Sequence, residues 1–191
     1  PVSSRRLSIT TRMTLQATAF LVVSATLIIA LLEWRGFLAG MPTSVKCLNA
    51  FFSGVTPRTA GFNSVDYAEA HPITLMVTDI YMFIGGGSAG TAGGIKITTA
   101  TVLLAAMLAE FKGRDATTVG HRTVPKSVVR QAMTVAAAGL VAVTAGVATL
   151  RICDPQFTAD QVNFEVISAF ATTGLSTGIT ADLSTPSQLA L

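Results

Sequence analysis

Two short stretches of the chain place a threonine, a glycine and a large apolar residue in the same order, a pattern suited to binding a cation. The first loop, residues 59–62, reads Thr-Ala-Gly-Phe, and the second loop, residues 172–175, reads Thr-Thr-Gly-Leu. Glycine lets the backbone turn so that carbonyl oxygens are exposed, and such carbonyls can replace the hydration shell of an ion. We therefore expect Thr59, Ala60, Gly61 and Phe62 to expose backbone carbonyls that can coordinate a cation, and the matching pattern makes the second loop a candidate for the same role.

The two loops belong to an internal repeat. When Gly61 is aligned with Gly174, Phe51 falls on Phe164 without a gap, and the threonines of the two loops also coincide. Each loop follows a long apolar segment and then a short one. Repeated units often form transport sites where they meet, so the repeat is more specific than either tetrapeptide.

The composition indicates an all-α integral membrane protein. Of the 191 residues, 50% are hydrophobic and 12% are charged, whereas a soluble domain has about a quarter charged residues. Residues 15–32 and 132–150 contain no charge. Each segment is roughly long enough to cross a ~30 Å hydrocarbon core as a helix.

The distribution of charge predicts the orientation of the chain in the membrane. The net charge of +3 is too small to indicate nucleic-acid binding. Basic residues precede the first apolar span and fill the connection before the last one, so both segments are expected in the cytoplasm and both loops outside. These basic residues are Arg5, Arg6, Arg12, Lys112, Arg114, Arg122, Lys126 and Arg130. The opposite segments are mainly acidic, which would concentrate cations there.

The short apolar segments before the loops predict half-length helices. Residues 44–53, with Ser44 as the N-cap, and residues 159–169 are each too short to cross a bilayer. They are expected to re-enter between full spans at residues 15–34 and 127–150. The C-terminal end of such a helix carries a partial negative charge that favours a cation at the loop. A further helix is expected to begin near Pro186.

A glycine-rich segment interrupts the apolar region at residues 73–108. As one helix this region would be about 54 Å long, more than a normal span. We expect two helices, residues 73–84 and 98–110, joined by an irregular loop within the membrane, because glycines at this density weaken a helix. The alternative is a continuous helix that uses its glycines for close packing.

The same glycines allow a rival interpretation as a nucleotide-binding enzyme. Residues 85–90 match G-x-G-x-x-G, and a β-like run at residues 76–84 precedes them. The uncharged, membrane-length segments on both sides argue against this interpretation. His71 and His121 are far apart, and Cys47 and Cys153 have neither metal-site nor disulfide-framework spacing. No nucleophile–base pair is evident, so we predict that the chain is not an enzyme.

Four polar residues near these features need partners. Arg58 is expected behind the first loop, paired with an acid or with carbonyls, because a cation inside a cation site would oppose binding. Asn63 is expected to support the same loop. Lys96 is expected within the membrane, either in a structural pair or as a charge in a gate. No role is assigned to Asp79.

Three stretches, residues 55–66, 82–96 and 164–178, together resemble the Trk/Ktr/HKT superfamily of potassium transporters, specifically its bacterial membrane subunit. The resemblance implies four helix–pore loop–helix repeats around one pseudo-fourfold, cation channel-like pore. The chain is similar to a fragment with the third repeat complete at residues 1–115, a cytoplasmic linker at 116–126, and part of the fourth repeat at 127–191.

The resemblance also implies a function and partners. The chain is expected to take part in potassium uptake across the plasma membrane, with sodium as an alternative substrate, no cofactor of its own, and K⁺ at the filter as the only metal. Homodimerisation and a cytoplasmic, nucleotide-binding RCK/KTN ring are implied. The basic linker would be its docking surface or simply a solvated loop. The implied filter is lined by Thr59, Ala60, Gly61, Phe62, Thr172, Thr173, Gly174 and Leu175. The implied gate beneath the filter comprises Gly85, Gly86, Gly87, Gly90, Gly93, Gly94 and Lys96.

Overall fold

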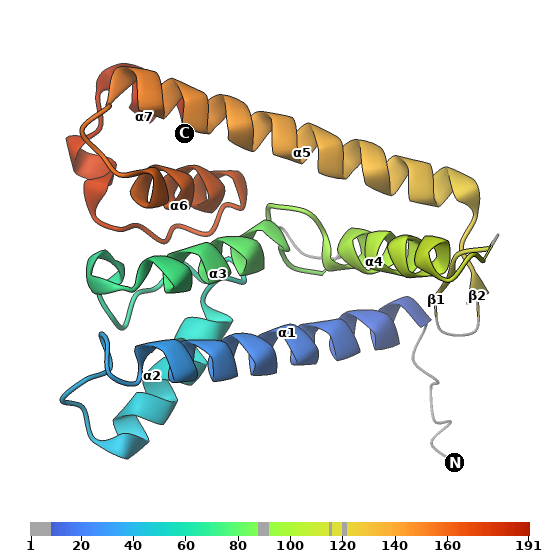
Figure 1. The fold of residues 1–191 in the computed structure, drawn as a ribbon, viewed down its shortest axis with the longest axis horizontal. Helices are drawn as coiled ribbons and strands as arrows, with labels where there is room; N and C mark the ends of the chain where they lie inside the picture. The colour runs from blue at the N-terminus through green and yellow to red at the C-terminus, as the bar shows by residue number, and fades with distance from the viewer. Residues whose placement is uncertain (1–8, 88–91, 115, 120–121) are drawn as a thin grey trace, which may run out of the picture.

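The computed structural model describes residues 9–87, 92–114, 116–119 and 122–191, and these residues are mostly helical (Figure 1). The elements in order are α1 (Ile9–Glu33), α2 (Thr43–Val55), η1 (Tyr67–Glu69), α3 (Pro72–Phe83), α4 (Ile97–Phe111), β1 (Thr118–Val119), β2 (Arg122–Thr123), α5 (Lys126–Cys153), α6 (Ala159–Phe170), η2 (Ile179–Asp182) and α7 (Thr185–Ala190).

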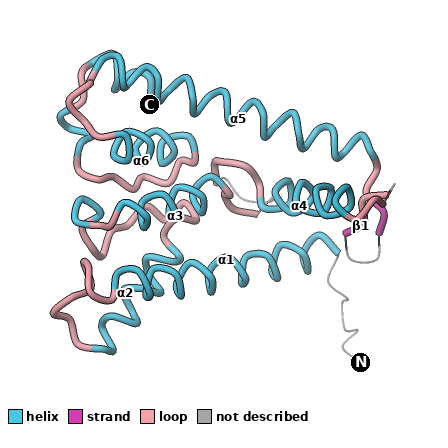
Figure 2. The backbone as a smooth tube through the Cα atoms, in the orientation of Figure 1, coloured by secondary structure: helices cyan, strands magenta, loops and turns pink. Residues whose placement is uncertain are grey.

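The helices form a layered arrangement around a broken central helix. Figure 2 shows α3 and α4 following one another along one line, with a loop between them, and α1 and α5 running along opposite sides. Helix α1 packs against α2, α3 and α4, and α5 packs against α4, α6 and α7. Helix α6 also packs against α3, which brings the two short helix–loop units toward the break.

Two helices have the length and composition of membrane spans. Thr10–Glu33 and Lys126–Cys153 qualify, and α3 and α4 are shorter apolar helices. Large apolar side chains cover the outside of the long helices; Leu31 is 81% exposed and Val141 is 69% exposed. Such surfaces suit lipid rather than water. Both full spans predicted from the sequence are present, although α1 begins before residue 15.

The predicted break of the central apolar region is confirmed. Helices α3 and α4 match the expected segments to within one residue at each end. The alternative of a continuous helix is therefore wrong. The nucleotide-binding alternative also fails, because the run that would have to be a strand before the glycines lies almost entirely in α3.

The predicted N-cap of the first short helix is wrong. Helix α2 begins at Thr43, and the capping position is Pro42, which makes no side-chain hydrogen bond. Ser44 therefore lies inside the first turn. Helix α6, in contrast, begins with a capping box in which Thr158 and Gln161 bond each other's backbone N–H groups.

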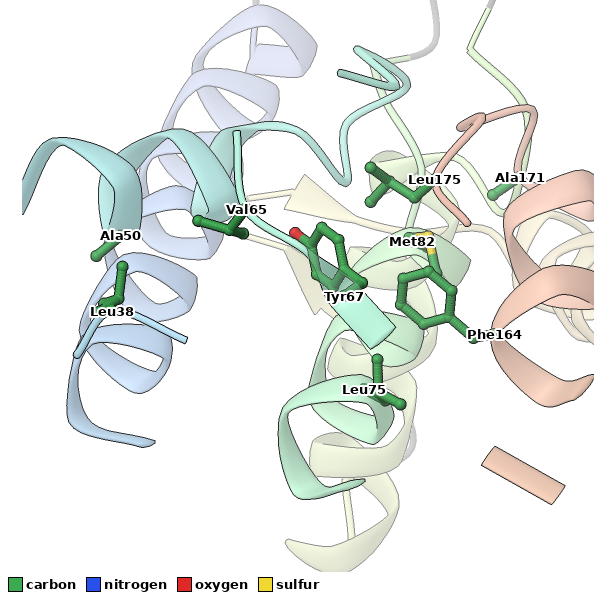
Figure 3. Packing of buried hydrophobic residues seen from close by; sticks show 9 residues of the cluster. All are labelled: Leu38, Ala50, Val65, Tyr67, Leu75, Met82, Phe164, Ala171 and Leu175. Atoms are coloured by element: carbon green, nitrogen blue, oxygen red, sulfur yellow. The ribbon is translucent and has the colours of Figure 1, made fainter. Parts of the chain in front are cut away.

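A buried cluster joins the two helix–loop units. Tyr67 lies near its centre, with its ring centroid 5.3 Å from that of Phe164 on α6. Figure 3 shows Tyr67 between Val65 on one side and Met82 and Phe164 on the other. Leu175 of the second loop belongs to the same cluster. The segment after the first loop thus packs on the helix that precedes the second loop.

The connection between α4 and α5 contains a short hairpin. Strands β1 and β2 pair antiparallel, with Thr118 opposite Thr123. The hairpin lies at the end of the molecule opposite to the α1–α2 and α5–α6 connections (Figure 1). The basic residues predicted to face the cytoplasm between α4 and α5 therefore lie near this end of the molecule, away from the two loops.

Candidate cation site

Each loop follows directly from the C-terminal end of a short helix. Helix α2 has 13 residues and α6 has 12, so each is about 20 Å long and shorter than a membrane span. The carbonyls at a helix C-terminus carry a partial negative charge. Both loops therefore begin where the backbone favours a cation.

The two loops share an unusual backbone conformation at equivalent positions. Thr59 has φ 63° and Thr172 has φ 52°, and no other described non-glycine residue has a positive φ. Gly61 and Gly174 follow with φ values of 70° and 85°. A left-handed threonine costs roughly 1–2 kcal/mol. Strain of this kind persists where the surroundings enforce it, commonly at functional sites.

The two loops touch one another at their glycines. A Cβ atom added to Gly61 would lie 2.2 Å from the carbonyl oxygen of Thr173 and 3.6 Å from the Cα atom of Gly174. No side chain fits at this distance. The glycine of the first loop therefore permits the close approach, in addition to its left-handed conformation.

The first loop is closed by a hydroxyl group. Thr56 Oγ1 donates a hydrogen bond of 2.7 Å to the carbonyl of Phe62, and Thr59 Oγ1 donates one of 2.6 Å to the carbonyl of Arg58. The Phe62 carbonyl, one of the predicted ion ligands, therefore already has a donor. The carbonyls of Thr59, Ala60 and Gly61 accept no hydrogen bond from any residue that the structure describes.

A buried carboxylate that the sequence analysis missed holds the segment after the second loop. Glu165 on α6 is 4% exposed. It accepts hydrogen bonds from Ser176 Oγ at 2.6 Å, Thr177 N at 2.9 Å and Thr180 Oγ1 at 2.8 Å. The repeat places Phe52 at the equivalent position. The sequence contained one sign of this role: a short apolar helix carries an acidic residue where the repeated helix has an apolar one.

The second loop is more enclosed than the first. The side chain of Leu175 is 1% exposed, and that of Thr173 is 4% exposed. The Thr173 hydroxyl is buried and has no hydrogen-bond partner among the described residues. No described donor bonds to the four carbonyls of this loop either. They are therefore available to another ligand.

The glycine loop between α3 and α4, residues 85–96, is closed at its neck by backbone hydrogen bonds. Gly85 N donates to the Ile95 carbonyl at 2.8 Å, and Ile95 N donates to the Phe83 carbonyl at 2.9 Å. A Cβ atom on Gly85 would lie 2.0 Å from the Gly93 carbonyl oxygen. Gly85 thus allows the two sides of the neck to meet. Of the predicted gate residues, Gly90 lies outside the described residues.

The glycine loop also contacts the second loop directly. Gly93 N donates a 2.9 Å hydrogen bond to Thr172 Oγ1. A Cβ atom on Gly93 would lie 2.7 Å from this hydroxyl oxygen and from the Ala171 carbonyl. Lys96 Nζ donates to the carbonyl of Ala92, so the lysine bonds within its own loop.

The acid or carbonyl partner predicted for Arg58 is not found in the described chain. The Nη1 and Nη2 atoms of Arg58 are buried and have no hydrogen-bond partner there, so its pairing stays a prediction. Asn63 is exposed, and its side chain makes no described hydrogen bond. Asp79 is buried, and its Oδ1 atom has no described partner.

Side chains suited to binding a metal do not gather anywhere in the described part of the chain. No group of three or more His, Cys, Asp or Glu residues there is arranged to hold a metal ion. Cys47 and Cys153 are free thiols. Backbone carbonyls and threonine hydroxyls are the oxygen atoms that the two loops contain.

Comparisons with known proteins place the chain in a family. The family described as TrkH, cation transport protein, matches residues 7–191. The chain is 37% identical over 180 residues to the Ktr system potassium uptake protein B of Bacillus subtilis, covering 93% of this chain and 40% of the relative. It is 34% identical over 183 residues to the potassium/sodium uptake protein NtpJ of Enterococcus hirae, covering 94% and 41%. The chain thus spans about two fifths of the length of these relatives.

Proposed function

Because the chain belongs to the TrkH family of cation transport proteins, we propose that its two loops form two quarters of a potassium filter in a membrane uptake protein. Relatives of the chain are named potassium uptake proteins, and this family transports ions rather than catalysing covalent chemistry. Potassium is the proposed substrate, and no cofactor is needed in this chain.

The observation that carries the proposal is the pair of loops in contact. Both have left-handed threonine and glycine residues with one residue of ordinary φ between them. A glycine with a positive φ lets the backbone turn tightly, which can expose carbonyl oxygens. The carbonyls at residues 59–61 and 172–175 lack described donors, so potassium can replace its hydration water with them. Phe62 is the exception, and we propose that its carbonyl fixes the shape of the first loop instead.

The glycine loop is proposed as the gate. It interrupts the α3–α4 helix, and its Gly93 bonds to Thr172 of the second loop. An ion that leaves the filter toward the basic end of the molecule would have to pass this loop. A change in the neck between Gly85 and Ile95 would move the obstruction without unfolding either helix.

The proposed assembly extends beyond this chain. We propose that residues 1–115 and 127–191 are the third and part of the fourth repeat of a four-repeat subunit, with residues 116–126 as a cytoplasmic linker. The subunit would lie in the plasma membrane with both filter loops outside, as the basic residues near the hairpin favour. It would form homodimers over a nucleotide-binding RCK/KTN ring. Two relatives are named as parts of a Ktr system.

The test is potassium uptake by the complete subunit in cells that lack their own potassium uptake. Gly61→Asp and Gly174→Asp are expected to abolish selective uptake, because each places a side chain and a charge in the filter. Gly40→Asp is the matched control, since Gly40 also has a positive φ but has no atom within 4 Å of an added Cβ. Uptake that survives both filter changes, or that is equal for sodium and potassium in the wild type, would contradict the proposal.

A further inference from the structure

A cavity unrelated to the two loops opens at the basic end of the molecule. Its volume is about 660 Å³, and it lies between the last turn of α4, the hairpin and the first turns of α5. This is the right-hand end in Figure 1. The charged residues that line it are Glu110, Arg114, Lys126 and Arg130.

The cavity has an excess of positive charge that the described chain does not neutralise. Three cationic side chains and one carboxylate line it. No ion pair is found between Arg114, Lys126 or Arg130 and any described residue, and all three side chains are exposed. Unpaired cations around a concave surface attract an anionic group.

One wall of the cavity is apolar. Ala106 and Ala109 contribute from α4, and Val129 and Met133 contribute from α5. Met133 is 54% exposed. Further along the same helices, Met107 on α4 and Val135 on α5 are also exposed apolar side chains. The cavity is therefore amphipathic, with cations at the helix ends and apolar side chains further along the helices.

The start of α5 adds to the positive potential. Pro125 and Lys126 line the cavity, and the capping position makes no side-chain hydrogen bond. The N–H groups of the first turn and the helix dipole there favour a negative charge. They supplement the three cationic side chains.

We propose that this cavity binds the phosphate headgroup of an anionic phospholipid. Arg114, Lys126 and Arg130 contact the phosphate, and an acyl chain lies along Met133. The position fits, because basic pockets between the cytoplasmic ends of membrane helices suit such headgroups. An acidic protein surface would pair with the cations but would leave the apolar wall on α4 and α5 uncovered.

The experiment measures lipid binding by the complete subunit. The delipidated protein is titrated with phosphatidylglycerol and with phosphatidylcholine, and bound lipid is counted by native mass spectrometry. The combined Arg114→Gln, Lys126→Gln and Arg130→Gln variant is expected to weaken phosphatidylglycerol binding at least about tenfold, because the three positive charges that attract the phosphate are lost. Lys112→Gln is the matched control, because Lys112 is exposed at the same end but does not line the cavity.

Controls separate the lipid from other ligands. The charge-preserving Arg114→Lys, Lys126→Arg and Arg130→Lys variant should retain phosphatidylglycerol, and melting curves check that every variant is folded. Equal binding by the Gln variant and the wild type would overturn the proposal. Competition by inorganic phosphate or glycerol phosphate at the same concentration as the lipid would identify a soluble-phosphate site instead. Loss of regulatory-ring binding with unchanged lipid binding would identify a protein-docking surface. None of these results depends on filter function.

Discussion

The two loops have the same backbone signature but are held in different ways. In each loop a threonine and a glycine two residues later have a positive φ. The first loop is closed by one hydroxyl, Thr56 on the Phe62 carbonyl, and the Phe62 side chain is 70% exposed. The second loop is followed by a segment bonded to Glu165, and Leu175 is 1% exposed. Equivalent conformations are thus held in place by different supports.

This difference separates what sets a loop's conformation from what holds it in place. The conformation accompanies the shared Thr-x-Gly pattern. Glycine permits a left-handed φ, and threonine adopts it only where its surroundings hold it there. The support depends on neighbours. In the proposed four-repeat pore, the exposed side of the first loop would face another repeat, whereas the second loop is covered by α6 and the glycine loop within this chain.

The largest expected effect distinguishes the two glycines. Gly61→Ala should abolish potassium uptake, because its Cβ would lie 2.2 Å from the Thr173 carbonyl oxygen in addition to the strained φ. An alanine at position 174 would also have the strained φ, but its Cβ atom would make an ordinary contact of 3.8 Å with the Cα atom of Gly61. It should cost about 1–2 kcal/mol and reduce uptake by roughly tenfold. Ion flux into cells that express equal amounts of each variant measures the difference. Equal losses would show that the contact between the loops does not matter.

The next prediction compares the supports. Glu165→Gln should lower the selectivity for potassium over sodium, because an amide replaces one of the two carboxylate oxygens that receive Ser176, Thr177 and Thr180. Hydrogen bonds to a charged group are worth about 1.5–3 kcal/mol each, against about 1 for a neutral pair. Thr56→Val, which removes one neutral bond from the first loop, should therefore have the smaller effect. Competition between the two ions in uptake measures both. A larger loss from Thr56→Val would reverse the comparison.

Much of this framework follows from the sequence, because it depends on local patterns. The span lengths, the two short helices and the glycine break come from apolar run length and glycine density. The helix break was predicted to within one residue at each end. The repeat placed the two glycines at equivalent positions. The prediction of Ser44 as the N-cap was wrong because small differences in free energy decide where a helix begins. Here the helix begins at Thr43, immediately after Pro42.

The supports could not be predicted, since they join residues that are distant in the chain. Glu165 receives its donors from 11 to 15 residues later, in a loop and in the short 3-10 helix η2. Glu33, which is fully buried at the end of α1, accepts from the backbone N–H of His71, 38 residues away. The bond between Gly93 and Thr172 spans 79 residues. The packing of α3 on α6 brings these two segments together.

A smaller effect is expected from loosening the glycine loop from the second loop. Gly93→Ala should push the loop away from Ala171 and Thr172 and raise potassium flux by weakening the obstruction. Gly87→Ala is the control within the same loop, because its Cβ would meet, among the described residues, just the end of the Thr14 side chain, at 3.0 Å. Flux through purified subunits in vesicles avoids differences in expression. Unchanged or reduced flux in the folded Gly93→Ala protein would argue against gating by this contact.

The smallest expected effect is on the pH dependence of stability, and it concerns the second helix–loop unit, which contains Asp154. Hydrogen bonds from Ser187, Ser184 and then Gln156 hold the pKa of Asp154 below its ordinary value of 3.8. The carboxylate receives the Ser184 N–H and hydroxyl, which ties the end of α5 to the start of α7. A carboxyl group with a lowered folded-state pKa stabilises the fold above its unfolded-state pKa, and this contribution is lost as the pH falls through the folded-state value.

The melting temperature of the complete subunit in detergent should therefore fall slightly as the pH is lowered below about 4. Asp154→Asn should melt lower at neutral pH and lose this part of the pH dependence, whereas the control Asp182→Asn, at an exposed carboxylate of η2, should keep it. The aligned position in the first unit is Met41, which cannot titrate. If Asp154→Asn melts like the wild type at every pH, this bond does not stabilise the second unit. The hydrogen bonds to Glu165 would then have to hold the segment after the second loop without help from the end of α5.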